Sequence, residues 1–159
     1  MNNDIRKLID DNWEDIKELI AQRAEAEQKP KTIWDLETKD SKEYYRIEAS
    51  GFVEESCFNA TYDKYVRDMG NAFLTKEEAE FEKERRKVET ILRKYSRPFK
   101  VGEENWYITH CHDEKDFSVT AYSVVDYGIL CFESEEMIKK AIYEIGGDRL
   151  KKYWFGVAE

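Results

Sequence analysis

The stretch from Gly70 to Tyr95 constrains the fold more than any other part of this chain, because it contains a complete helix signal. Thr75 suits an N-cap, and Glu78 lies three residues later, so the two side chains can form a capping box. Glutamates fill the first turns and arginines and lysines the later ones, which complements the helix dipole. Pro98 then stops the helix. One apolar stripe runs through the stretch at helical spacing: Phe81, Val88, Ile91, Leu92 and Tyr95.

A shorter copy of this pattern lies near the C-terminus. Phe132-Glu133-Ser134 repeats the spacing of Phe73-Leu74-Thr75, which is an aromatic residue, a spacer and a hydroxyl cap. Gly146 or Gly147 supplies a left-handed stop. The residues between cap and stop predict a second amphipathic helix through an apolar set at helical spacing: Met137, Ile138, Ala141, Ile142 and Ile145.

A predicted hairpin precedes each helix. Residues 43–48 and 52–58 read as two strands around a tight turn, and residues 105–112 and 117–122 as two more. Residues 129–132 form a further short strand. The sequence therefore predicts an α+β fold, in which two ββα-like units in tandem build an antiparallel sheet with the helices packed on one face.

The N-terminal residues 3–28 carry apolar side chains three and four apart and many charges, which indicates a separate amphipathic helix. Lys29-Pro30-Lys31 reads as a linker. We therefore expect residues 1–30 to form a helix and linker, and residues 31–159 a single α+β domain. The apolar stripe, with Trp13, Ile16 and Ile20, predicts contact with a partner or a homodimer through this helix.

The composition limits the functional classes. The net charge is −9 and charged residues make up 38% of the chain, which argues against direct binding of nucleic acid. An acidic surface can instead compete with nucleic acid for a basic groove, although acidity also serves solubility alone. The three cysteines are scattered, and neither a signal peptide nor a membrane span is evident, so we expect a soluble cytoplasmic protein.

No catalytic signature emerges, and no cofactor is expected. The segment that most resembles a catalytic signature is His110-Cys111-His112. In a strand the two histidines share a face and could begin a zinc site, yet the spacing that structural zinc sites use is missing. Cys111 would point away from both imidazoles, which disfavours a cysteine nucleophile. A metal-dependent or cysteine hydrolase, with His110 and His112 as its metal-binding pair, is therefore the weakest interpretation.

Two sets of side chains are candidates for binding. The first would contact a partner protein, through aromatic and cationic residues in connections and acidic residues in the first turns of the central helix. It comprises Tyr62, Tyr65, Arg67, Tyr127, Glu77, Glu78 and Glu80. The second would hold a nucleotide or oligonucleotide on basic residues. It comprises Arg85, Arg86, Arg93, Lys94 and Arg97, which equally suit pairing with the acidic turns before them.

The motifs gathered above, with Trp34-Asp35-Leu36, the GNAFLTKEEAE segment from Gly70 and the IGGDRLKKYWFGV ending, resemble a family of small phage and prophage proteins of Gram-positive bacteria. The resemblance covers about residues 33–157. It implies a non-enzymatic accessory protein that binds and inhibits or modulates a host protein, including defence targets such as CRISPR nucleases, in an infected or lysogenic cell. The family supplies no catalytic residues.

Overall fold

A computed structural model describes residues 11–28, 32–36, 42–59, 61–110, 117–124 and 128–157, and helix α4 (Lys76–Tyr95) is its central element. The predicted capping box is confirmed. The Thr75 hydroxyl accepts from the amide of Glu78 at 3.2 Å, and the Glu78 carboxylate accepts from the amide of Thr75 at 3.3 Å. Helix α4 ends at Tyr95, and Ser96 and Arg97 separate this end from Pro98, as the sequence predicts.

The first unit of the fold consists of β1 (Glu43–Ile47), β2 (Val53–Cys57), helix α3 (Lys64–Asp68) and β3 (Ala72–Phe73). Its antiparallel sheet has the order β2-β1-β3, with Tyr45 of β1 opposite Phe73 of β3. The 3₁₀ helix η1 (Ile33–Asp35) precedes this unit. A small core lies here, formed by Leu36, Tyr44, Phe58 and Ala72.

The second unit consists of β4 (Ser96–Arg97), β5 (Asn105–His110), β6 (Phe117–Tyr122), β7 (Cys131–Phe132), helix α5 (Glu135–Ile145) and helix α6 (Gly147–Tyr153). Its sheet has the order β4-β7-β5-β6. The larger core of the protein lies between this sheet, α5, α6 and the second half of α4. The buried residues are Val88, Leu92, Phe132, Ile138, Ala141, Ile145 and Leu150.

Both units contain a hairpin, a short strand and a capped helix in that order, whereas α3, β4 and α6 have no counterpart in the other unit, and the α+β prediction is confirmed. In each unit a hairpin is followed by a two-residue strand that pairs with the first hairpin strand, β3 with β1 and β7 with β5. A capped helix then begins, with Thr75 as the cap of α4 and Ser134 as the cap of α5. The repeated cap spacing in the sequence thus corresponds to a repeated arrangement of strands.

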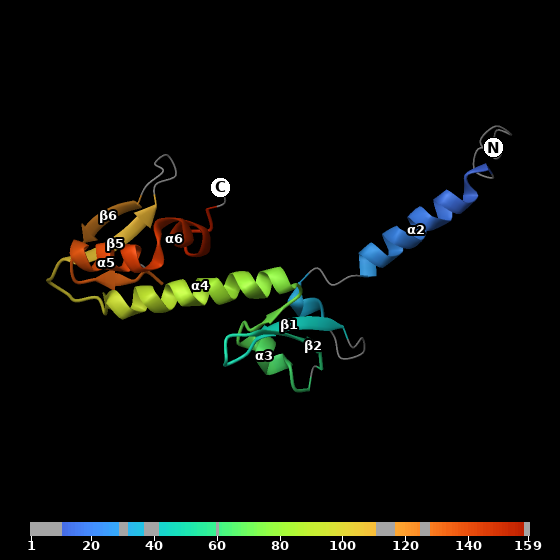
Figure 1. Ribbon diagram of the computed structural model, residues 1–159, viewed down its shortest axis with the longest axis horizontal. Helices are drawn as coiled ribbons and strands as arrows, with labels where there is room; N and C mark the ends of the chain where they lie inside the picture. Colours follow the sequence, from blue (N-terminus) through green and yellow to red (C-terminus); the bar gives the residue numbers. More distant parts are fainter. Residues whose placement is uncertain are drawn as a thin grey trace.

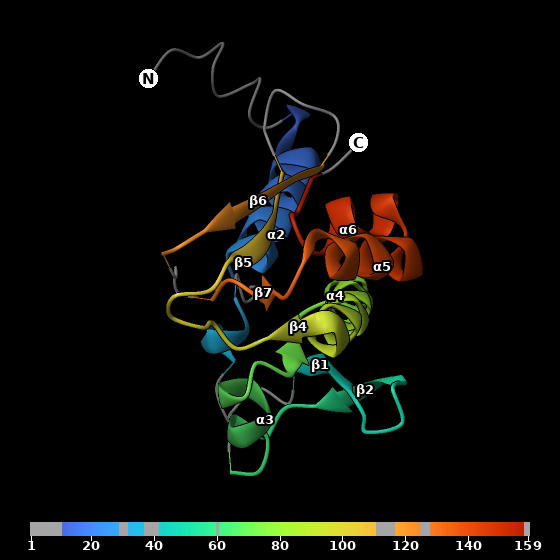
Figure 2. The same ribbon diagram turned by 90° about the vertical axis from the view of Figure 1, so that its left-hand side faces the viewer.

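The strands form two antiparallel sheets where the sequence suggested one. Strand β3 ends just before α4 and β4 begins just after it, so the two strands lie at opposite ends of a helix of 20 residues. Such a helix is about 30 Å long, so its flanking strands cannot be neighbours in a sheet. Figure 1 shows α4 passing from the first unit to the second, and Figure 2 looks along α4, with the two units on opposite sides of it.

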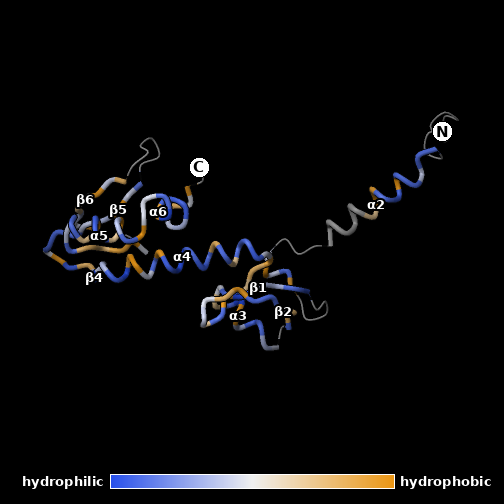
Figure 3. Tube along the Cα trace, viewed as in Figure 1, coloured by the Kyte–Doolittle hydropathy of each residue, from blue (hydrophilic) through white to orange (hydrophobic). Residues whose placement is uncertain are grey.

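Helix α2 (Trp13–Gln28) lies apart from both units in Figure 1. Three of its large apolar side chains are exposed: Trp13 is 46%, Leu19 64% and Ile20 59% exposed. Figure 3 shows apolar positions of this helix among hydrophilic ones. The expected start of this helix near Asn3 falls outside the described residues. Among the helices that the structure describes, none has the length and apolar character needed to span a membrane.

Candidate partner-binding site

Helix α3 and the turns on either side of it present exposed large side chains. Tyr62 is 74%, Tyr65 64% and Met69 80% exposed. Their spacing of three and four residues places them on one side of the helix, while Val66 on another side packs against the small core. We call these three residues the tyrosine face. Tyrosine and methionine are enriched in protein interfaces, and two of the three residues were predicted from the sequence.

The tyrosine face is held by hydrogen bonds that link α3 to β1 and α4. Gly70 leaves α3 with φ of 67°, a conformation that favours glycine. The amide of Asn71 donates to the Val66 carbonyl, and its side chain donates to the Ile47 carbonyl at 2.8 Å. Arg86 of α4 donates to the side chain of Asn71 and to the carbonyl of Gly70, both at 2.9 Å. A rigid platform of this kind lowers the entropy lost on binding.

Arg67, predicted as a contact residue, lies against aromatic rings of its own unit. Its guanidinium carbon is 4.8 Å from the centre of the Trp34 ring and 5.7 Å from that of Phe58. Its side chain is only 20% exposed, which suits a role in holding η1 against α3. Trp34 itself is 61% exposed. Tyr127, the fourth residue predicted in a connection, falls outside the described residues.

The predicted acidic residues begin α4, and two of the three have local partners. Glu78 completes the capping box and also accepts from the amide of Leu74 at 3.1 Å. Glu80 forms an ion pair with Lys83. Glu77 is exposed and makes no hydrogen bond or ion pair within the described part of the chain. Of these three carboxylates, Glu80 is therefore paired with a cation and Glu78 is used in the helix cap, whereas Glu77 is available for a partner.

The predicted basic set is engaged within the molecule. Arg85 pairs with Glu82 and Glu89, Arg93 pairs with Glu89, and Lys94 reaches Glu144 of α5 at 2.8 Å. This last contact raises the pKa of Lys94 and lowers that of Glu144, chiefly through their mutual hydrogen bond. The structure thus favours the pairing interpretation of these cations over the ligand-binding one.

Arg86 and Arg97 hold backbone in place. Arg86 pairs with Glu82 besides supporting α3. Arg97 donates to the carbonyls of Pro98 and Glu104 and to the side chain of Asn105. A hollow of about 450 Å³ lies beside β4, with Arg93 and Arg97 among its lining residues. Its cations are already occupied by these internal partners, so it has little capacity left for an anion.

A pH-dependent prediction follows from Glu82. Burial would raise its pKa, but hydrogen bonds from Arg85 and Arg86 outweigh burial, and the pKa is lowered from 4.5. A lowered carboxyl pKa contributes stability above about pH 4.5, and this stability is lost as the pH falls further. Glu82→Gln is expected to reduce the free energy of unfolding by about 1–2 kcal/mol at neutral pH. Urea unfolding should show this difference shrinking below about pH 4.

Glu77→Gln is the matched control, because Glu77 is exposed on the same helix. It should leave the free energy of unfolding within about 0.5 kcal/mol of the wild-type value. An effect of Glu82→Gln that is equal at neutral and acid pH would contradict the assignment of its stabilising role to the charged carboxylate.

The histidine strand offers no metal centre in the part of the chain described here. His110 packs edge-on against Phe117 and lies 5.7 Å from the ring of Phe155, while His112 lies outside the described residues. Among described residues, no group of three or more histidine, cysteine, aspartate or glutamate side chains could hold a metal ion.

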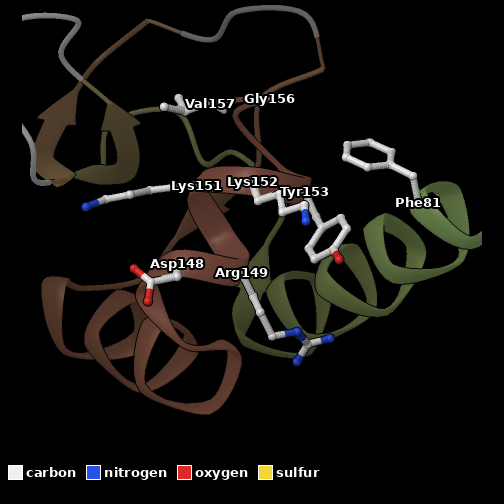
Figure 4. A pocket seen from close by; sticks show the side chains of 8 residues that line it. All are labelled: Phe81, Asp148, Arg149, Lys151, Lys152, Tyr153, Gly156 and Val157. Carbon is white, nitrogen blue, oxygen red and sulfur yellow. The ribbon is translucent and has the colours of Figure 1, made fainter. Parts of the chain in front are cut away.

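A second candidate surface was missed by the sequence reasoning. A groove of about 590 Å³ lies between the first half of α4 and α6. Phe81, interpreted from the sequence as part of the apolar stripe, is 40% exposed here and faces Tyr153 with ring centres 5.1 Å apart (Figure 4). Arg149, Lys151 and Lys152 also line the groove. The sequence contains one signal for this surface, which is the basic run with Arg149, Lys151 and Lys152 in an otherwise acidic chain.

Comparison with known proteins identifies no relative of this chain. No protein-family model, curated protein or solved structure matches it. The function must therefore be argued from the surfaces described above.

Proposed function

We propose that this chain is a non-enzymatic protein that binds another protein through the tyrosine face of α3. The observation that carries this proposal is the exposure of Tyr62, Tyr65 and Met69 on α3 and its flanking turns, where the end of the helix is fixed by Asn71 and Arg86. Exposed aromatic side chains on a rigid support are the usual anchors of protein interfaces, because they bury a large area at low entropic cost.

The net charge of −9 supports a partner with a basic surface, because complementary charge accelerates association. The resemblance to phage and prophage proteins points to a bacterial host protein in the cytoplasm as the partner. A defence nuclease with a basic nucleic-acid groove is the first class to test. Inhibition by occupation of such a groove would need no catalytic residue.

The test is an affinity pull-down from nuclease-treated bacterial host lysate, read by mass spectrometry, followed by titration of the purified partner. Tyr62→Ala combined with Tyr65→Ala is expected to weaken the complex at least about 100-fold, since each anchor is worth about 2 kcal/mol or more. Circular dichroism should show an unchanged fold, because both side chains are exposed.

Tyr143→Ala is the matched control, because Tyr143 is 93% exposed on α5, in the other unit. It should bind the partner as the wild type does. Equal retention of a partner by the wild type and the double variant would remove the tyrosine face from the proposal. Equal losses in the double variant and the control would indicate non-specific adhesion.

A further inference from the structure

A cavity lies in the second unit, between β5, the segment that leads into β7, and the residues that follow α6. Its volume is about 320 Å³, at the lower end of the range for ligand pockets, about 300–1,000 Å³. Leu92 of α4 and Phe132 of β7 line it and are each 1% exposed, so the cavity reaches the larger core. Ile129, also in the lining, is 44% exposed and marks the side that opens to solvent. We call this space the β5–β7 cavity.

The walls of the β5–β7 cavity are apolar and rich in aromatic rings. Ile108 and Leu130 supply aliphatic side chains, and Trp154 and Phe155 supply rings. Among the described residues that line the cavity, none is an aspartate, glutamate, lysine or arginine. A charged ligand would therefore lose its hydration here without gaining an ionic partner. A flat aromatic ligand suits these walls, because the edges and faces of aromatic rings attract each other.

Three side chains of the lining carry polar atoms, and two of them make no hydrogen bond within the described part of the chain. The hydroxyl of Thr109 donates to the carbonyl of Ser118 at 3.2 Å. The imidazole of His110 and the indole N–H of Trp154 have no hydrogen-bond partner among the described residues. Such N–H groups on an otherwise apolar wall suit a ligand that brings one acceptor oxygen.

We propose that the β5–β7 cavity binds a small, neutral, planar aromatic molecule of one or two rings that carries one polar oxygen, such as a hydroxyl group. The rings pack against Leu130 and Trp154, and the oxygen forms a hydrogen bond with the imidazole of His110. His110, the described histidine of the segment that the sequence singles out, thereby acts in recognition of a ligand.

The probe for this proposal is 2-naphthol, which has two fused rings and one hydroxyl group and is neutral at neutral pH. Isothermal titration calorimetry with the full-length protein is expected to give a Kd of about 0.1–1 mM, in keeping with the small number of ligand atoms. The anion 2-naphthoate has the same rings and an ionised carboxylate, so it should bind at least about tenfold more weakly. Absence of binding by 2-naphthol, or equal affinity for the two probes, would overturn the proposal.

Nuclear magnetic resonance shows where the probe binds. The chain has four tryptophans, so four indole N–H signals report on separate parts of the fold. Addition of 2-naphthol should shift the signal of Trp154, which is identified by its loss in Trp154→Phe. The signals of Trp13 and Trp34 should stay unchanged, because neither residue lines the cavity. Binding without a shift of the Trp154 signal would place the ligand elsewhere and overturn the proposal.

Substitutions in the lining test the same cavity. Leu130→Phe enlarges a wall residue and should weaken binding of 2-naphthol at least about tenfold. Ile129→Trp, at the half-exposed opening, is the second obstructing variant and serves where Leu130→Phe disturbs the fold by circular dichroism. His110→Leu removes the polar partner and should weaken binding about tenfold. Phe81→Ala, in the groove between α4 and α6, is the control and should bind as the wild type does. Full affinity in a folded obstructing variant would overturn the proposal.

These results are independent of the proposed function, because the tyrosine face contributes no residue to the lining of the β5–β7 cavity. Failure of 2-naphthol to bind would leave the proposed protein partner standing, and failure of the tyrosine face would leave the cavity standing.

Discussion

Leu92→Ala is expected to lower the free energy of unfolding by about 3–5 kcal/mol, in a single transition that includes both units. Leu92 lies on α4 and is 1% exposed in the larger core, where it packs with Val88, Ile138 and other buried residues. Its truncation removes buried apolar contacts and leaves a cavity. The first half of the same helix contacts the strands of the first unit. When the weakened core unfolds and α4 unfolds with it, both sheets therefore lose the helix that they pack against.

Urea unfolding followed by circular dichroism and tryptophan fluorescence measures this effect. Trp34 lies in η1 beside the first unit, and Trp106 and Trp154 lie in the second. All signals should change at one urea concentration, lower than in the wild type. Val101→Ala, at a position 92% exposed, is the control and should have almost no effect. Two separate transitions would show that α4 does not couple the units.

Asn105→Ala is expected to cost about 3 kcal/mol, which for a chain of this size lowers Tm by roughly 10 °C. Asn105 is fully buried, and its side chain uses its whole hydrogen-bonding capacity. The oxygen accepts from the amide of Lys100 and from Arg97, each at 3.0 Å. The nitrogen donates to the carbonyls of Lys100 and Glu103, each at 2.9 Å. The substitution leaves these buried partners unpaired.

Glu104→Ala is the matched control for Asn105→Ala. Its side chain is exposed, while its backbone carbonyl, which accepts from Arg97, is kept by alanine. Thermal unfolding of this control should stay within about 0.5 kcal/mol of the wild type. A loss of similar size in both variants would mean that the turn after β4, and not the buried amide, sets the stability.

The structure leaves some of the predicted site residues exposed and packs others inside the fold, because exposure depends on contacts between segments that are distant in sequence. Tyr62 and Tyr65 could be proposed because they lie in a connection, where side chains usually reach solvent. Arg67 lies in the same connection, yet it is stacked on Trp34, 33 residues away along the chain and brought close only by folding. Phe81 has the spacing of a core residue, and the structure leaves it at the edge of a groove.

The sequence by itself determined the local elements of this protein. The caps at Thr75 and Ser134, the two hairpins and the ends of α4 and α5 follow from contacts within a few residues, and the structure contains them. Only the tertiary structure decided that there are two sheets, that α4 joins them, and that Lys94 and Arg149 pair with Glu144 and Glu84 in other elements. Capping and periodicity are properties of neighbouring residues, whereas these pairings depend on which faces meet after the chain has folded.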